Sequence, residues 1–463
     1  MTFDQLTATA AAERMTGRRR FALIVLLTAS FTLAVDFSVL NVALPTIGAD
    51  VGFALANLQW IATAFALCSA GFTLFFGRIA DLFGRRRLFL AGMALLGVAS
   101  LAGGLATSPA ALLIARVAQG LATAAVTPAA LSLLTTSFPE GRLRDRALGL
   151  NGALMAAGFT SGAVLGGVLT DLLSWRWAFF LNIPVVLFVL FAARTVLTES
   201  RPAARPRIDL PGAITVTLAL LAVIYGATSA SSHGWGDPLV LGSLIVGVLL
   251  LGAFWMIEKR VAAPLVPVAI LGRRNVGWGN IAGLLAFLTE TSLVFLLTLY
   301  LQDVLGYSPL EAGLSFAVLG VGTVLGGVLG PKLIARINAK RTLVAGFGVQ
   351  AVATASLVLL GPAPAWIALL LAATFVGGIA NLVAIVGFMV TATAGLPDEE
   401  QGLATGLTTM SQQVGITLGI PLMSAIATAQ SSVLAGVTTA IYVNTTLCVL
   451  AALLLGTNLR PTT

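Results

Sequence analysis

Apolar stretches of about twenty residues recur along the whole chain, separated by short polar and basic clusters. A helix needs about that length to cross ~30 Å of hydrocarbon. Of the 463 residues, 58% are hydrophobic and 10% are charged, whereas soluble domains carry about 25% charged residues. The pattern therefore predicts an all-α integral membrane protein. The fourteen predicted spans are 21–45, 55–77, 87–106, 110–136, 146–170, 176–198, 209–230, 238–257, 276–302, 309–334, 342–360, 364–395, 402–428 and 433–458.

The basic residues set the orientation of these spans. With a cytoplasmic N-terminus, 24 of the 26 Lys and Arg residues fall at cytoplasmic span ends, as the positive-inside rule requires. Omitting one span would reverse the side of every later cluster, so fourteen spans and a cytoplasmic C-terminus are predicted. The polar segment ending in "GRRR" before the first span is typical of an uncleaved signal-anchor. The preference for Arg over Lys, with abundant Ala and Gly, indicates a high-GC bacterial genome. We expect the spans to lie in the inner (plasma) membrane.

Two correspondences at one offset indicate an internal repeat. The segments "GRRRLFLAG" (Gly84–Gly92) and "NAKRTLVAG" (Asn338–Gly346) begin 254 residues apart. The same offset takes Asp36 to Glu290, the other carboxylate well inside a span. Repeats of this kind are a transporter architecture. We therefore expect two pseudo-symmetric six-helix bundles, residues 1–200 and 270–463, with a linker and two inserted central helices at 201–269.

Asp36 and Glu290 are the candidate proton carriers. A carboxylate at the bilayer centre costs about 2.5–3.5 kcal/mol on insertion scales. Removal from water disfavours the charged form, so a buried acid can bind and release protons near neutral pH. Arg116, inside the fourth span, can stabilise the charge when it comes close. The alternative for each acid is a structural role, with Arg116 or a backbone group as its partner.

Several motifs resemble those of a known transporter family. "GRIADLFGRRR" contains Gly77, Asp81, Gly84, Arg85 and Arg86 and resembles the signature loop between the second and third helices of the major facilitator superfamily. "RVAQGLATA" (Arg116–Ala124) is similar to the fourth-helix motif of that family. The resemblance implies a gating role for the loop and a role in proton movement for Arg116.

The fifth span carries "GFTSGAVLGG", which resembles the antiporter motif of the superfamily. Its glycines let two helix backbones approach closely. Ala163 stands where the family usually has Pro after the central Gly, so the usual kink is not expected. "SWRWAFFLNIP" and "DFSVLNVALP" are similar to segments of the fourteen-span drug:proton antiporters. The motif glycines are Gly158, Gly162, Gly166 and Gly167.

The resemblance implies a proton-coupled efflux transporter that exports hydrophobic drugs or antibiotics, cationic ones included, by alternating access. A dedicated exporter of one endogenous metabolite, a proton-coupled importer and a transport-inactive receptor are the alternatives. Polar and aromatic residues near the acids are candidates for the solute cavity, with core packing or lipid contact as the other interpretation. These residues are Phe37, Asn41, Gln119, Phe287, Phe295 and Gln412.

Other functions lack the residues that they need. The net charge is +8, but the basic residues lie beside the spans, which argues against nucleic acid as a partner. No Lys follows a Gly, so there is no P-loop for ATP. Cys68 and Cys448 lie in separate apolar runs, and His233 is the single histidine, so no metal or cofactor site and no enzyme activity is expected. We expect a monomer whose partners are the lipid bilayer, protons and a small hydrophobic solute.

Overall fold

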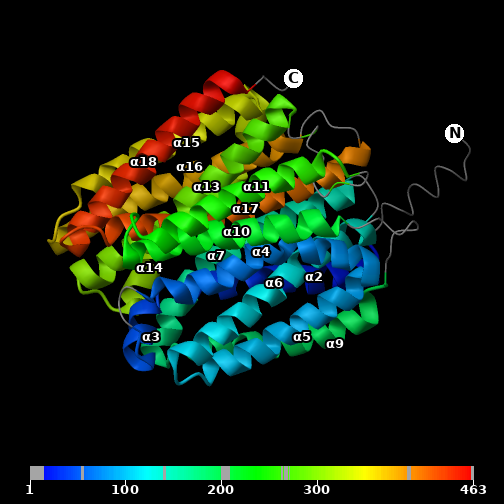
Figure 1. Cartoon of the computed structure of the whole chain (residues 1–463), viewed down its shortest axis with the longest axis horizontal. Helices are drawn as coiled ribbons and strands as arrows, with labels where there is room; N and C mark the ends of the chain where they lie inside the picture. Colours follow the sequence, from blue (N-terminus) through cyan, green and yellow to red (C-terminus); the bar gives the residue numbers. More distant parts are fainter. Residues whose placement is uncertain are drawn as a thin grey trace, which may run out of the picture.

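The computed structural model describes residues 15–53, 57–138, 142–199, 209–261, 272–393 and 398–459, together with Pro264 and Ile270. Within these ranges the secondary structure is entirely helical, without strands. The long helices run side by side along the molecule, with α3 at one end (Figure 1). Most of the predicted linker, residues 201–208 and much of 262–271, lies outside the described residues.

The first half and the inserted hairpin contain ten helices within the described ranges. They are α2 (Gly17–Ser38), α3 (Leu44–Val51), α4 (Gln59–Phe83), α5 (Arg85–Gly104), α6 (Pro109–Ser137), α7 (Arg142–Leu172), α8 (Trp177–Phe180), α9 (Asn182–Val196), α10 (Leu210–His233) and α11 (Pro238–Glu258).

The second half is built in the same manner. Its elements are α13 (Arg274–Leu299), the π-helical turn η2 (Tyr300–Val304), α14 (Pro309–Ile337), α15 (Ala339–Ser356), the 3₁₀ turns η3 (Leu357–Leu359) and η4 (Pro364–Trp366), α16 (Ile367–Thr393), α17 (Asp398–Ala427) and α18 (Val433–Asn458).

Eleven helical segments in the described part of the chain are long and apolar enough to cross a membrane. Three further helices, α4, α7 and α17, are 25, 31 and 30 residues long. In each of these three helices, some side chains lie outside the part of the chain that the structure describes. The prediction of a polytopic all-helical membrane protein is therefore confirmed.

Two predicted span boundaries are wrong. The stretch 21–45 is not one helix, because α2 ends at Ser38 and α3 begins with Pro45 in its first turn. Proline lacks the N–H that a continuing helix would need, but it fits a first turn. The second stretch was expected to end at 77, yet α4 continues to Phe83. Most of the predicted loop is therefore helical, and the chain reverses only at Gly84.

The starts of several helices follow directly from local sequence. Ser108, Asp237 and Ser308 each cap a helix that has Pro in its first turn. The cap side chain accepts a hydrogen bond from a backbone N–H that has no partner within the helix. In α14 the arrangement is a full capping box, since Glu311 also accepts from the Ser308 N–H.

The two reversals that the repeat predicts have the same backbone geometry. Gly84 joins α4 to α5 with φ 108°, and Asn338 joins α14 to α15 with φ 72°. Asn338 is the one non-glycine residue with positive φ among those described. Such angles suit glycine, and asparagine tolerates them better than most residues. Both residues lie 254 positions apart, the offset found in the sequence.

The two halves share a large hydrophobic core at one end of the molecule. A large buried cluster at the α3 end combines first-half residues such as Val39 and Ile61 with second-half residues such as Leu297 and Ile420. Gln302 also donates a hydrogen bond of 2.8 Å to the Val42 carbonyl across the two halves. Toward the other end, one buried cluster contains first-half residues and another contains second-half residues.

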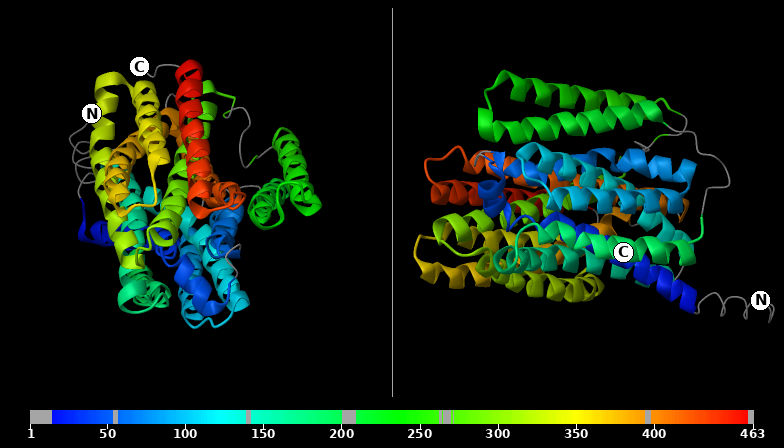
Figure 2. Two further views of the ribbon diagram at one scale, coloured as in Figure 1. Left: turned by 90° about the vertical axis from the view of Figure 1, so that its left-hand side faces the viewer. Right: turned by 90° about the horizontal axis from the view of Figure 1, so that it is seen from below.

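The hairpin of α10 and α11 lies along one side of the bundle (Figure 2). Two side-chain hydrogen bonds tie α10 to α4: Thr217 to the Gly71 carbonyl at 2.7 Å, and Gln59 to the Thr228 carbonyl at 3.0 Å. A further apolar cluster joins α10 with Leu407 and Val414 of α17. The hairpin therefore contacts both halves where α4 and α17 meet.

Candidate functional site

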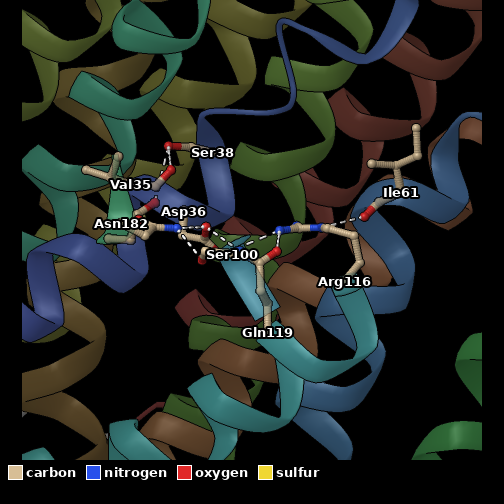
Figure 3. Close-up of polar contacts among 9 residues, drawn as sticks. Val35, Asp36, Ser38, Ile61, Ser100, Arg116, Gln119 and Asn182 are labelled. Carbon is tan, nitrogen blue, oxygen red and sulfur yellow. Dashed lines mark hydrogen bonds and ion pairs between the residues drawn. The ribbon is translucent and has the colours of Figure 1, made fainter. Parts of the chain in front are cut away.

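Asp36 lies in the interior of the first half, with 1% of its surface exposed. Its Oδ1 atom accepts one hydrogen bond from Gln119 Nε2 on α6 at 3.0 Å and another from Asn182 Nδ2 on α9 at 2.5 Å. Figure 3 shows the side chains of Gln119 and Asn182 directed toward the carboxylate. A charged group at membrane depth requires partners of this kind, and the sequence places them on α6 and α9.

Arg116 completes this arrangement on α6, fully buried. Its Nη1 lies 3.5 Å from Asp36 Oδ2 and donates to Gln119 Oε1 at 2.8 Å. Its Nε donates to the Ile61 carbonyl of α4 at 2.9 Å, and its guanidinium lies 4.3 Å from the Phe65 ring centroid. Gln119 therefore bridges the two charges: it accepts from the cation and donates to the anion.

Ser100 on α5 links the two amides. Its hydroxyl oxygen accepts from Gln119 Nε2 at 3.0 Å and from Asn182 Nδ2 at 3.1 Å. The sequence analysis found Asp36, Arg116 and Gln119 but missed Ser100 and Asn182. Asn182 had a weak signal, as a polar residue just before Pro184 in an apolar span, whereas a lone Ser such as Ser100 has none.

The glycine motif of α7 packs directly on the helix that carries Asp36. A Cβ atom added at Gly158, Gly162 or Gly166 would overlap with atoms of α2, among them the backbone carbonyls of Phe31 and Val39. Contacts this close require glycine. The motif therefore sets the distance between α7 and α2.

Gly167 and Ala163 of the same motif face the other half of the protein. The Gly167 position lies against the Pro309 carbonyl and Gly313 of α14, and a Cβ at Gly313 would lie 3.0 Å from the Ala163 carbonyl oxygen. α7 thus contacts α2 on one side and α14 on another. Both small residues sit where the two halves meet.

The predicted gating segment is held by a residue that the sequence analysis did not single out. Glu199, just after α9, accepts hydrogen bonds from the backbone N–H groups of Arg86 and Arg87 at 3.1 and 3.2 Å. Its carboxylate therefore caps the N-terminus of α5, where Arg85 is the first residue. Arg86 in turn donates to the Arg194 carbonyl of α9 at 2.7 Å.

Two glycines of that segment have distinct surroundings. A Cβ atom added at Gly77 would lie 3.7 Å from Pro128 of α6, and one added at Gly84 would overlap with the Glu199 carboxylate. The side chain of Asp81 lies outside the described residues, so its role in the gating loop stays a prediction.

Glu290 lies apart from Asp36, within the second half. It lines a cavity of about 20 Å³ with Gln350 of α15 and Thr374 and Asn381 of α16. Asn381 donates to the Ala286 carbonyl at 3.1 Å, while its buried Oδ1 accepts no hydrogen bond from the described residues. A polar space of this size has room for about one water molecule. Each half thus has one carboxylate facing its own bundle interior.

The predicted cavity residues do not form one cluster. Phe37 packs on Phe65 and Phe159, with centroids 5.8 and 5.9 Å apart. Phe295 belongs to the core that both halves share, and Phe287 packs against the core of the second half. Asn41 is buried, and its Oδ1 accepts no hydrogen bond from the described residues. Gln412 is half-buried. Gln119 belongs to the Asp36 site instead.

The family model of the Major Facilitator Superfamily matches residues 26–420 and, separately, residues 279–463. The chain belongs to the major facilitator superfamily. It is therefore a multi-pass membrane transporter rather than an enzyme, as the resemblance implied.

Relatives in this superfamily are named for antibiotic export or resistance. The cephamycin export protein of Amycolatopsis lactamdurans is 42% identical, over 87% of this chain and 84% of the relative. The puromycin resistance protein of Streptomyces alboniger is 37% identical, over 89% and 82%. The tetracenomycin C resistance and export protein of Streptomyces glaucescens is 31% identical, over 89% and 76%.

A solved structure supports the fold independently. The human organic anion transporter superposes with a TM-score of 0.64 at 15% sequence identity. The match covers 95% of this chain and all of that chain. At this identity the likeness concerns the arrangement of helices alone.

Proposed function

We propose that this protein exports hydrophobic drugs or antibiotics, cationic ones included, in exchange for protons. One observation carries the proposal: the Asp36 carboxylate and the Arg116 guanidinium are buried together in the first half, 3.5 Å apart. A proton that binds Asp36 removes the negative charge and leaves Arg116 buried without its counter-ion. Such a change alters the relative energies of two packings, which is what coupling to transport requires.

The relatives support the direction of transport. Three of them are named for export of, or resistance to, cephamycin, puromycin and tetracenomycin C, and each aligns with most of this chain. These compounds differ in structure, so the names favour efflux without selecting a substrate. A dedicated exporter of one endogenous compound is the second candidate, since the relative with 42% identity is named for a single antibiotic class.

The architecture that we propose has fourteen spans. Three long helices, α4, α7 and α17, add to the eleven segments that meet the criteria for spanning. Residues 1–200 and 270–463 are then the two six-helix bundles, and 201–269 is the linker with the inserted hairpin. An even number of spans, with the basic span ends inside, places both termini in the cytoplasm of a bacterial cell.

The distribution of buried clusters supports alternating access. At the α3 end the halves share one large core and the Gln302–Val42 hydrogen bond, whereas toward the other end two buried clusters each lie within one half, and a smaller cluster around α10 includes residues of both α4 and α17. In the proposed orientation the α3 end faces outward. This conformation is therefore closed to the outside, and opening there requires the shared core to separate.

Proton movement can supply the energy. One proton charge crossing 100 mV releases about 2.3 kcal/mol, so one proton per solute supports roughly a fifty-fold gradient for each 100 mV. We propose that no ATP is consumed and that the monomer is the working unit. Glu290, in the second half, is proposed as a further proton-binding acid.

Inside-out membrane vesicles test the proposal. Respiration acidifies their lumen, and uptake of puromycin and of ethidium is then measured with and without a protonophore. We expect uptake that stops when the protonophore collapses the gradient, and Asp36→Asn should abolish it. Asp171→Asn, which removes an exposed acid near the end of α7, is the matched control and should transport normally.

The alternatives give different results in the same vesicles. A proton-coupled importer would move solute out of preloaded inside-out vesicles when the lumen is acidified. A transport-inactive receptor would show neither solute uptake nor solute-dependent loss of the pH gradient. Full gradient-driven uptake by the Asp36→Asn variant would refute the role of Asp36. A dedicated exporter would move a single compound from a panel of unrelated antibiotics.

A further inference from the structure

The two oxygens of the Asp36 carboxylate have different surroundings. Oδ1 accepts hydrogen bonds from Gln119 and Asn182 at 3.0 and 2.5 Å. Oδ2 accepts none from the described residues and lies 3.5 Å from Arg116 Nη1. This asymmetry distinguishes two atoms that are chemically equivalent in a free carboxylate.

The amide groups cannot turn to Oδ2 without losing other bonds. Each NH₂ group has two hydrogens, and each donates both to Asp36 Oδ1 and to Ser100 Oγ. The oxygen of Gln119 is also engaged, since it accepts from Arg116. The donors on the Oδ1 side are therefore fully used in this one arrangement.

The chain segment that leads to Asn182 is anchored at the α3 end of the molecule. It is the first residue of α9, directly after the short helix α8. Before α8, Trp175 and Arg176 both donate to Asp50 Oδ2, at 2.9 and 2.6 Å. The segment "SWRWAFFLN" thus joins an anchor at the α3 end to an amide on the buried acid.

We propose that Asn182 is a positioning residue that keeps Asp36 Oδ1 hydrogen-bonded, so that Oδ2 is the atom at which the coupling proton binds and leaves. A hydronium ion gives its proton to a lone pair of Oδ2, an O–H bond forms and water is released. In the reverse step water takes the proton and the carboxylate regains its charge. The inference rests on the proposed function, in which Asp36 carries that proton.

The surroundings of Asp36 allow a specific prediction about pH. Among the described residues, Arg116 is the charged group within ion-pair distance, and the two side chains that hydrogen-bond to the carboxylate, Gln119 of α6 and Asn182 of α9, are uncharged. Asn182 donates to the charged form of Asp36 and so stabilises it. Loss of one such bond should shift the titration by about one pH unit.

Infrared difference spectroscopy of the purified protein tests this without any solute. The carbonyl band of protonated Asp36 is identified by its absence in Asp36→Asn and is followed against pH. In Asn182→Leu we expect its midpoint to move to higher pH by about one unit. Ser100→Ala, which removes the shared acceptor but keeps both amides, should move it by less than Asn182→Leu does.

Asn444→Leu is the matched control. Asn444 is a buried amide on α18 that donates to the Thr289 carbonyl and to Ser292 Oγ, at 2.9 and 3.0 Å. Its loss should affect folding to a similar degree but leave the Asp36 midpoint unchanged. An unchanged midpoint in both Asn182→Leu and Ser100→Ala would overturn the assignment. Normal transport by Asp36→Asn would instead refute the proposed function, so the two failures are distinguishable.

Discussion

Gln119 bridges Asp36 and Arg116, whose charged groups lie 3.5 Å apart, by accepting from the guanidinium and donating to the carboxylate. The ion pair is thus part of a network in which the amide stabilises both charges at once. Buried pairs of this kind depend on such additional hydrogen bonds, since removal of two charges from water costs several kcal/mol per ion. Either charge alone is therefore expected to be less stable in this interior than the pair.

Arg116→Met should therefore destabilise the protein strongly. It leaves the Asp36 carboxylate buried without a counter-ion, which typically costs about 3–5 kcal/mol. The thermal midpoint of the purified protein in detergent measures the effect near neutral pH. The double variant Asp36→Asn/Arg116→Met has no buried charge at this site and should regain most of the lost stability, but no proton-driven transport. If the double variant were as unstable as Arg116→Met alone, the loss would come from packing and not from charge.

Gly166→Ala should separate α7 from α2. The new methyl group would occupy the position of the Val39 carbonyl on α2, and a backbone group cannot move aside as a side chain can. Overpacking of this kind costs about 1–3 kcal/mol, seen as a lower thermal midpoint. Gly348→Ala is the control, because a methyl group there meets no atom within 4 Å in the described structure. Equal midpoints for the two variants would contradict the close contact.

Much of this architecture follows from local sequence. The offset of 254 residues predicted equivalent turns, and Gly84 and Asn338 both have positive φ. The apolar stretches predicted the positions of the long helices, because a bilayer requires a certain length of apolar helix. The end of α2 at Ser38 was missed, since residues 39–44 are as apolar as those before them.

The site was only partly predictable for a different reason. Asp36 and Arg116 stand out because charges are rare inside spans, and that rarity alone indicates a partner. Asn182, Ser100 and Glu199 act through contacts between helices that are distant in the sequence. No local pattern states which helices become neighbours, so these partners emerge only from the packed structure.

The contact between Asp50 and Arg176 predicts a pH-dependent contribution to stability. The hydrogen bond from Arg176, with a second from Trp175, holds the pKa of Asp50 below its usual value of 3.8. The folded state therefore favours the charged form, so the contribution is present above that value and is lost as pH falls through the lowered pKa. The difference in thermal midpoint between wild type and Asp50→Asn should be small, equal near pH 7 and pH 5, and absent in strong acid. A difference that grows on acidification would have the wrong sign.

Gly84→Ala should disrupt the turn before α5. The residue has φ 108°, which L-residues rarely adopt, and a Cβ there would meet the Glu199 carboxylate. We expect both lower stability and loss of the carboxylate cap on α5. Glu199→Gln keeps the shape of the side chain and weakens only the charged hydrogen bonds to Arg86 and Arg87. Its effect on the thermal midpoint should thus be clearly smaller, and the reverse order would show that the backbone angle does not matter.

The hairpin of α10 and α11 should move with the first half during transport. Two side-chain hydrogen bonds tie α10 to α4. The contacts of α10 with Leu407 and Val414 of α17 are between apolar side chains, which can slide past one another. In a background without the native Cys68 and Cys448, a disulfide between Gly71→Cys and Leu221→Cys joins α4 to α10 where a Cβ atom added at Gly71 would lie 3.4 Å from Leu221 Cδ2. Proton-driven uptake in vesicles should survive this cross-link.

A cross-link on the other side of the hairpin should have the opposite effect. Ala230 of α10 and Ala425 of α17 belong to one small buried cluster, so a cysteine pair there ties the hairpin to the second half. If α10 travels with α4, this bond prevents the halves from rocking, and uptake should fall at least tenfold until a reductant restores it. Equal sensitivity of both cross-linked variants would mean that the hairpin moves independently of either half.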